Sequence, residues 1–323
     1  MKKYMALILA LLMVCSLMAC GTEGKEDELD PDMFFPGEET ASGNKEKTTT
    51  GTESIDIDPA DYDYSGMCGE EAYWVYREDS KELIIYGSGP MYDYEGPSDN
   101  ECAPWSDFGV KSAKIYGVST IGEDSFYRNE TLTSVEIADS VESIESFAFS
   151  QCESLTSVEI PADVTNIEEH ALSGCYTMEK ITVKSGNSTF MAEDGVLFTK
   201  DGKTLVQYPA GKTDTNYTVP NGVITIGWGA FSGTQYLQQL DLGSDVEVIE
   251  TNAFTDRLAE TTIPTMSLPV SLKLIEDDAF GRGIEKIYYA GTQEQWEQIE
   301  NEEFPEASYD KHYMYGAAIY YEQ

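Results

Sequence analysis

The sequence has little positive charge. Its 323 residues include 20 Lys and Arg against 59 Asp and Glu, which gives a formal net charge of −39 at pH 7. Binding to nucleic acid requires a basic surface that neutralises phosphates, so this composition predicts no nucleic-acid partner. A basic protein surface or a cation would be attracted instead. The same charge can also serve only to keep an extracellular protein soluble.

Histidine and the common catalytic patterns are scarce as well. His170 and His312 are the two histidines, and His170 is expected in an exposed turn. No spacing typical of a Ser-His-Asp triad or of an H-E-x-x-H zinc site occurs. The acidic run at residues 56–63 is similar to a calcium loop, but Pro59 and Ala60 stand where a ligand and a glycine are needed. We therefore predict no enzymatic activity, no catalytic residue, no metal site and no cofactor. A hydrolase with an unrecognised carboxylate site is the alternative left open.

One run of apolar residues stands out near the start of the chain, at residues 5–14. It follows Lys2 and Lys3 and precedes Leu-Met-Ala-Cys at residues 17–20, an order typical of a signal peptide. The run is too short to span a membrane. Leu-Met-Ala-Cys resembles the lipobox of bacterial lipoproteins, which implies cleavage before Cys20 and an anchor of several acyl chains on its sulfur. An ordinary secretory signal with a chance cysteine is the alternative.

The segment after this cysteine is predicted to be disordered. Residues 21–64 contain 14 Asp or Glu, three Lys and few large apolar residues, so they cannot bury enough surface to fold. Repulsion between like charges extends such a chain. We expect residues 1–19 to be the signal peptide and residues 20–64 to be the lipidated Cys20 with an acidic tether.

A repeated phrase determines the expected fold. It has the form V-x-x-I with an aromatic residue or leucine five positions after the isoleucine, and an alternating strand-like run follows it. Its copies begin at Val118, Val141 and Val164, then at Val223 and Val246, with 23 residues between neighbours in each group, and finally at Leu272. Self-similarity with a period of about 20 to 50 residues predicts a solenoid, in which each unit buries its apolar edge against its neighbours.

The unit at residues 144–161, IESFAFSQCESLTSVEIP, resembles the BspA-like leucine-rich repeat, which reads roughly V-x-x-I-x-x-x-A-F-x-x-C-x-x-L-x-x-V-x-I-P. Trp74, the run at residues 83–91 and Pro104-Trp105 resemble the β-rich segment that often precedes such arrays, and residues 287–296 resemble their usual ending. The resemblance implies a leucine-rich repeat solenoid, β-rich with short helical or 3-10 turns on its convex side. We expect an N-terminal capping segment at 65–117, the solenoid at 118–289 and a C-terminal cap at 290–323.

The interruption near residues 184–222 is predicted to be a hairpin insertion. Residues 195–198 and 204–209 read as two strands around Asp201 and Gly202. Asp-Gly readily takes the positive φ angles that a tight two-residue turn needs. We expect a decorated repeat that keeps the stack continuous, and a ligand-binding finger is the alternative.

Four cysteines remain after the signal peptide and the lipidation site. Cys152 and Cys175 are one period apart, so they should lie above one another as buried thiols, with a disulfide as the alternative. Cys68 and Cys102 flank the N-terminal segment, and both the bridged and the reduced state are compatible with their spacing.

The strands also offer a candidate binding surface. Alternate residues of a strand face solvent, and in a solenoid they stack into columns. One column is acidic and polar, which favours a macromolecular partner, in particular a basic protein, over a buried small molecule. The candidate partner-binding residues are Glu136, Glu159, Thr182, Asp241 and Tyr288. A neighbouring column holds Ser134, Ser157, Lys180, Gln239 and Lys286.

The resemblance to BspA-like surface proteins implies a role in adhesion or in binding a host extracellular protein. The protein would be displayed at a bacterial cell surface, with the lipid anchor as its membrane contact. The alternative is a carbohydrate-binding or cell-wall-associated scaffold that uses aromatic residues at the ends of the array, such as Trp105 and Trp296. The simpler interpretation of those aromatic residues is that they cap the terminal coils.

Overall fold

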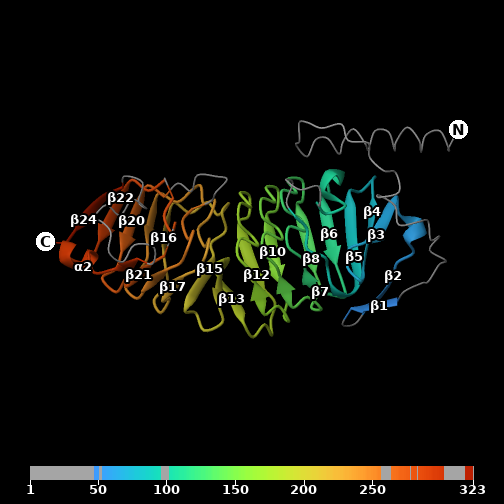
Figure 1. Ribbon diagram of the computed structural model, residues 1–323, viewed down its shortest axis with the longest axis horizontal. Coiled ribbons are helices and arrows are strands. Elements are labelled where there is room, and N and C mark those ends of the chain that lie inside the picture. Colours follow the sequence, from blue (N-terminus) through green and yellow to red (C-terminus); the bar gives the residue numbers. More distant parts are fainter. Residues whose placement is uncertain are drawn as a thin grey trace, which may run out of the picture.

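A computed structural model describes residues 47–50, 53–95, 102–255, 263–276, 278–281, 283–301 and 317–322. Its strands follow one another along the long axis, from β3 near one end to β24 at the other (Figure 1). The signal peptide, Cys20 and the first part of the expected tether lie outside these ranges. Within them, no helix is long and apolar enough to cross a membrane.

Antiparallel strands open the array. The elements at this end are β1 (Lys47–Thr50), β2 (Glu53–Asp56), η1 (Pro59–Asp61), β3 (Tyr64–Met67), β4 (Glu71–Arg77), β5 (Glu82–Pro90) and η2 (Ser106–Phe108). β1 pairs with β2, and β3, β4 and β5 pair in chain order. Regular structure therefore begins inside the segment predicted to be disordered. The physical reason is that Ile57 is buried against Val75, Ile84 and Tyr86 on one side of the β4 and β5 pair.

Each later coil adds a strand to two faces of the solenoid. One face consists of β6 (Ser112–Ile115), β8 (Ser134–Ile137), β10 (Ser157–Ile160), β12 (Lys180–Val183), β16 (Asn216–Thr218), β18 (Gln239–Asp241), β20 (Thr265–Leu268), β22 (Lys286–Tyr289) and β24 (Ala318–Tyr321). The other consists of β7 (Val118–Ile121), β9 (Ser143–Ile144), β11 (Asn166–Ile167), β15 (Thr204–Gln207), β17 (Thr225–Ile226), β19 (Val248–Ile249), β21 (Leu274–Ile275) and β23 (Glu300–Asn301). Paired strands from successive coils run parallel, as the repeat predicts. We call the outward-facing residues of the first set of strands the strand face.

Turns, rather than helices, close each coil. Three positions after the isoleucine of the repeated phrase, the backbone takes a positive φ in every described copy, at Asp124, Phe147, His170, Gly229, Asn252 and Asp278. Backbone hydrogen bonds then join equivalent turns, for example from the Phe126 N–H to the Ala148 carbonyl at 2.8 Å. The expected helical or 3-10 turns are therefore absent from the described repeats, and the short helix α2 (Gln293–Trp296) lies after the last of them.

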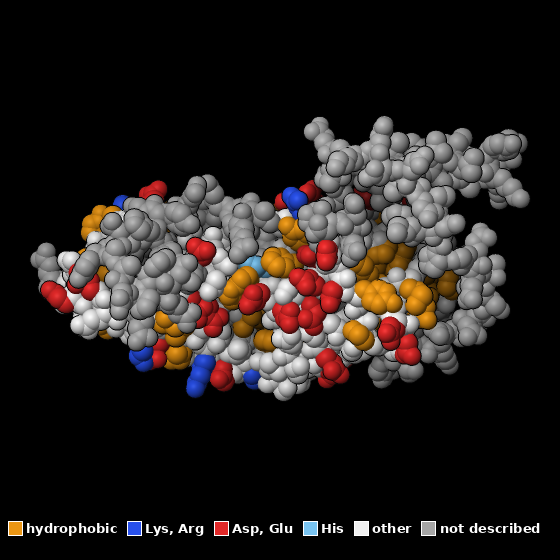
Figure 2. Space-filling view, viewed as in Figure 1, with side chains coloured by type: hydrophobic (Ala, Val, Ile, Leu, Met, Phe, Trp, Pro, Cys, Tyr) orange, Lys and Arg blue, Asp and Glu red, His pale blue; other side chains and the backbone are white. Residues whose placement is uncertain are grey.

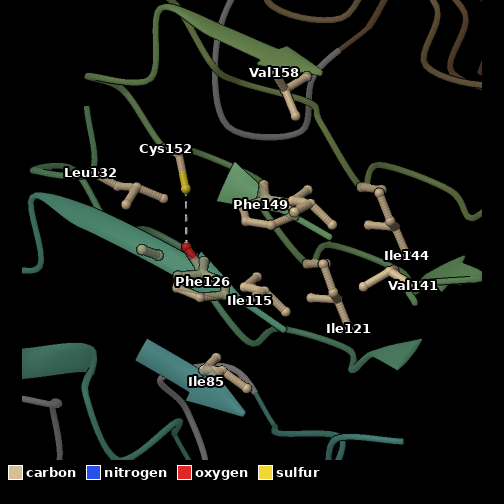
Figure 3. Close-up of a cluster of buried hydrophobic side chains, with 14 of the residues drawn as sticks. Ile85, Ile115, Ile121, Phe126, Leu132, Val141, Ile144, Phe149, Cys152 and Val158 are labelled. Carbon is tan, nitrogen blue, oxygen red and sulfur yellow. Dashed lines mark hydrogen bonds between the residues drawn. The ribbon is translucent and has the colours of Figure 1, made fainter. Parts of the chain in front are cut away.

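Aromatic rings stack along the core at the position five residues after the isoleucine in every described copy except the one with Leu172. Phe126 and Phe149 stack with ring centroids 5.0 Å apart, and the core around them is closely filled (Figure 3). In the second half, Phe231 and Phe254 are 5.3 Å apart, and Phe280 continues the stack at 5.4 Å. In each group of coils the rings thus bury their faces against neighbouring coils, and Leu172 takes this position in the coil between the groups, which explains why the repeat requires neighbours.

Strand β14 (Val196–Thr199) divides the apolar core in two. Leu197 packs into the N-terminal core, whereas Val196 and Phe198 pack into the C-terminal core. All three side chains are buried because β14 presents its alternate residues to opposite cores. The insertion consists of β13 (Phe190–Glu193), β14 and β15, which pair in chain order. Since β14 lies between the two cores, the inserted strands are part of the solenoid and do not form a projecting hairpin.

The turn of this insertion differs from the expected one. Antiparallel β14 and β15 are joined by four residues, of which Gly202 has a positive φ of 69° and Asp201 does not. The tight two-residue turn lies at Asp194 and Gly195, with φ of 50° and 79°, between β13 and β14. The Asp194 carboxylate forms an ion pair with Lys212 at 3.1 Å, which connects this turn to the following coil.

Tyr208 restores the stack after the insertion. Its N–H donates to the Ala230 carbonyl at 2.7 Å, and its ring stacks on Phe231 at 5.2 Å. Tyr208 therefore takes the place of the core phenylalanine in a shortened coil. The stack of rings therefore resumes at Tyr208, while the apolar core before the insertion stays separate from the core after it.

The cysteines of the repeats are buried thiols that lie one coil apart. The Cys152 thiol donates to the Phe126 carbonyl and the Cys175 thiol to the Phe149 carbonyl, both at 3.2 Å (Figure 3). Cys68 and Cys102 are likewise present as thiols. Burial raises the pKa of the Cys68 thiol to about 12, which keeps it protonated and unreactive.

Candidate interaction surface

The N-terminal half of the strand face carries two glutamates on neighbouring strands, Glu136 on β8 and Glu159 on β10. Register places Glu136 beside Lys114 of β6 and Glu159 beside Thr182 of β12. Both carboxylates are exposed, and Thr182 is half-buried. Glu159 and Thr182 therefore belong to one column, whereas Glu136 lies on β8, which contacts β10 without pairing with it.

Lys114 does not neutralise this column. Its ammonium group forms an ion pair with Glu82 at 2.9 Å. The hydrogen bond to Glu82 is the main cause that raises the pKa of Lys114, with smaller contributions from the charges of Glu82 and Glu136. Because Glu82 already balances Lys114, the negative charge at this end of the strand face comes from Glu136 and Glu159 and is offset in part by the exposed Lys180 of β12.

The two remaining candidate residues lie on a separate sheet. Asp241 aligns with Thr218 of β16 and with Ser267 of β20, and Ser267 aligns with Tyr288 of β22. This sheet ends at β16, and the hairpin of β13 and β14 lies between β12 and β16. The single column expected from the sequence is thus interrupted twice: β8 and β10 belong to different sheets, and no described pairing joins β12 to β16, where the hairpin of β13 and β14 intervenes. The second predicted column divides at the same two places.

Acidic residues on another side of the coils have a structural role. A glutamate that directly follows the repeat isoleucine accepts a backbone N–H from the preceding coil. The pairs are Glu168 with Ser146, Glu250 with Trp228 and Glu276 with Thr251, at N···O distances of 3.2, 3.0 and 2.9 Å. Burial is the main cause that raises the pKa of Glu250. These glutamates join coils to one another. The recurrence of Glu after the isoleucine was the sequence signal for them.

His170 is buried, and the prediction of an exposed turn residue is wrong. Its Nδ1 lies 2.9 Å from the Ser173 hydroxyl oxygen. Its ring contacts Phe147 and, edge to face, Trp228, with centroid distances of 5.0 and 3.7 Å. Trp228 comes from the coil after the insertion and covers the histidine, a contact that no local pattern around His170 could reveal.

The terminal tryptophans are parts of the caps. Trp105 is fully buried, and its indole N–H donates to the Ser125 carbonyl at 2.9 Å. Trp296 is 3% exposed and packs edge to face on Tyr289 with centroids 5.1 Å apart. Neither ring is available for stacking on a sugar, so these two tryptophans cannot serve the carbohydrate-binding alternative, whereas Tyr320 at the same end is 47% exposed. Tyr309, Tyr313 and Tyr315, which the sequence groups with them, lie outside the described residues.

Charge on the rest of the surface is mostly negative. Figure 2 shows a face on which red acidic side chains recur over many coils and blue basic ones are few. Despite this abundance, the described ranges hold no group of three or more His, Cys, Asp or Glu side chains that could hold a metal ion.

Comparison with known proteins identifies the repeats. A family model described as BspA type Leucine rich repeat region matches six copies, in residues 110–194 and 211–315. No curated protein matches the chain.

Three solved structures are similar to the chain. The pneumococcal vaccine antigen PcpA shares 15% identity over 71% of this chain and 82% of its own, with a TM-score of 0.47. A leucine rich cell surface protein from Faecalibacterium prausnitzii shares 16% over 74% and 98%, with a TM-score of 0.42. A leucine-rich repeat protein from Eubacterium ventriosum shares 20% over 70% and 87%, with a TM-score of 0.35. Because the family model matches more than half of the chain, this protein belongs to the family of BspA type leucine-rich repeat proteins.

Proposed function

We propose that this protein is a lipid-anchored protein of a bacterial cell surface that binds a macromolecular partner through its strand face, without catalysing a reaction. Leucine-rich repeat families generally provide scaffolds for protein interactions. Adhesion, or the binding of a host extracellular protein, is the role that fits a scaffold displayed on a tether.

The proposal of a basic protein surface as partner rests on one observation. Glu136 and Glu159 are exposed carboxylates on neighbouring strands, and within the described ranges no cation pairs with either of them. β8 and β10 lie next to each other in successive coils without pairing in one sheet, so the two charges lie near one another on the same face. Such a surface favours lysine or arginine side chains of a partner and accelerates their approach.

Charge reversal on the strand face tests this proposal. Glu136→Lys together with Glu159→Lys should abolish capture of a basic protein partner in an extracellular interaction screen. Because two buried or close charge pairs are each worth about 1.5 kcal/mol or more at interfaces, the loss should be at least about 100-fold in affinity.

A matched variant separates this local effect from the overall charge. Glu130→Lys together with Glu153→Lys changes the net charge equally, in the same two coils, at exposed positions outside the strands. Binding should survive this change. Equal loss in both double variants, or no loss in either, would contradict the proposed surface.

The anchor has its own test. Cys20→Ala removes the sulfur that would carry the lipid, so the variant should leave the membrane fraction and appear in the soluble fraction after cell lysis. Metabolic labelling with a fatty acid should mark the wild type and leave the variant unlabelled. Retention of the variant in the membrane would show that the lipobox interpretation is wrong.

A further inference from the structure

The C-terminal end of the strand face carries two exposed aromatic rings. Tyr288 on β22 and Tyr320 on β24 are 45% and 47% exposed. They occupy aligned positions on neighbouring parallel strands. Their rings stack with centroids 5.1 Å apart and planes inclined by 18°. The pair thus presents two exposed aromatic rings, each with a hydroxyl group, side by side on the strand face.

Among the residues that the structure describes, Tyr320 is the only aromatic ring stacked on Tyr288, and it covers one face of that ring. Tyr320 lies along the line that joins neighbouring strands. On the opposite side, the aligned residue of β20 is Ser267, whose side chain is small, and the next is Asp241 of β18. At about 4.8 Å per strand, Asp241 lies roughly 10 Å from Tyr288 with only a serine between them. We call Asp241, Ser267 and Tyr288 the Tyr288 subsite.

The Tyr288 subsite has an oriented carboxylate and hydroxyl groups that are free to bind a ligand. One oxygen of the Asp241 carboxylate accepts the Gly243 N–H at 2.9 Å, which fixes the orientation of the side chain. Within the described part of the chain, the second oxygen and the hydroxyl groups of Ser267 and Tyr288 have no hydrogen-bond partner. The subsite thus combines an apolar ring face with a carboxylate and two hydroxyl groups.

This segment is close to neutral, unlike the rest of the protein. The charge of Asp241 is offset by Lys286, which lies on the same side of β22 as Tyr288. The other outward residues of the five strands are uncharged: Asn216, Thr218, Gln239, Thr265, Ser267, Tyr288, Ala318 and Tyr320. Side-chain amides and hydroxyl groups can both donate and accept hydrogen bonds. A ligand that fits here is neutral and rich in hydroxyl groups.

We propose that the Tyr288 subsite binds one sugar unit of a neutral glycan. The C–H face of a sugar ring would stack on the other face of Tyr288, and its hydroxyl groups would donate to Asp241 and Ser267. A linear glycan lying across the strands would place about one sugar unit over each strand, since the strand spacing is similar to the length of a sugar unit. A polyanionic glycan is excluded because the net charge of −39 repels it. This proposal does not depend on the binding of a protein at Glu136 and Glu159, which lie on the other segment of the strand face.

The test is an array of neutral oligosaccharides probed with the full chain, followed by calorimetric titration of the tightest soluble glycan. Tyr288→Ala should weaken binding about tenfold, because it removes the stacking ring. Tyr288→Phe should keep the wild-type affinity to within a few fold. Ser267→Phe should abolish binding, because its ring fills the space over the serine while suiting an exposed strand.

Control variants distinguish the subsite from general effects. Tyr236→Ala removes a tyrosine that is equally exposed, 45%, outside the strands, and should bind as the wild type does. The double variant of Glu136 and Glu159 should also retain glycan binding, whatever its effect on a protein partner. Absence of binding to every neutral glycan on the array would overturn the proposal. Glycan binding that is unchanged in Tyr288→Ala and Ser267→Phe, or capture of a protein alone at this subsite, would overturn it as well.

Discussion

At the scale of single residues, the turns depend on a left-handed backbone that the sequence only partly reveals. Asp124 and Asn252 occupy this position with residue types that tolerate positive φ. Phe147 and His170 occupy it too, with φ of 55° and 57°, although such residues accept it at a cost of about 1–2 kcal/mol. The position could be aligned from the repeat, but its backbone geometry could not be inferred because two of its six residues, Phe147 and His170, are not types that indicate a positive φ.

Asp124 should make stability depend on pH. Burial, reinforced by the charge of Glu123, raises the pKa of Asp124 to about 6 from 3.8. Between these values the folded chain holds the proton and the unfolded chain has lost it, so stability falls as pH rises through this window. Asp124→Asn should therefore stabilise the fold at about pH 8, by about 1 kcal/mol after allowance for solvent screening. Urea unfolding at about pH 8 and about pH 5 measures the gain, which should shrink at the lower pH.

The reciprocal variant supplies the control. Asn252 is 4% exposed at the equivalent position, so Asn252→Asp should lose stability at about pH 8 and recover part of it at about pH 5. A gain for Asp124→Asn that is the same at both pH values would show that charge is not its cause.

At the scale of elements, the sequence predicts part of the insertion and misses another part. The antiparallel pair of β14 and β15 was predictable from two apolar runs around Asp201 and Gly202. The additional strand β13 and its turn at Asp194 were missed. The run Val196, Leu197, Phe198 is apolar without alternation, which is typical of a strand buried on both sides. That pattern could have indicated that β14 lies between two cores.

Two variants of β14 should destabilise different halves of the solenoid. Leu197→Ala should cost about 2–5 kcal/mol and Phe198→Ala about 3–5 kcal/mol, because each leaves a cavity in a packed core. Leu197 faces the N-terminal core and Phe198 the C-terminal core. Hydrogen exchange of the native protein should accelerate most in β10 and β12 for the first variant, and in β17 and β19 for the second.

Val270→Ala provides a control for these variants, since its side chain is 51% exposed and its loss should leave exchange almost unchanged. Identical exchange patterns in Leu197→Ala and Phe198→Ala would mean that the two cores unfold as one unit and that β14 does not separate them.

At the scale of the whole molecule, the period predicts the solenoid and the strand face but not the continuity of that face. Aligned strands allowed Glu159 and Thr182, or Asp241 and Tyr288, to be grouped from their spacing alone. The break between these groups depends on where the hairpin lies in space. The two proposed binding sites follow the same division: a basic protein at Glu136 and Glu159, and a neutral glycan at Tyr288.

The net charge of −39 should also weaken the fold at low ionic strength. Acidic side chains recur along a compact rod, whereas the unfolded chain lets them separate, so their repulsion favours unfolding. The screening length falls from about 30 Å at about 10 mM salt to about 8 Å at about 150 mM. Unfolding free energy, measured with urea across this range of NaCl, should rise by on the order of 1 kcal/mol. Glu130→Lys with Glu153→Lys raises the net charge by four units and should reduce this salt dependence. Stability that is constant or falls with added NaCl would show that local pairs, such as Lys114 with Glu82, outweigh the repulsion between coils.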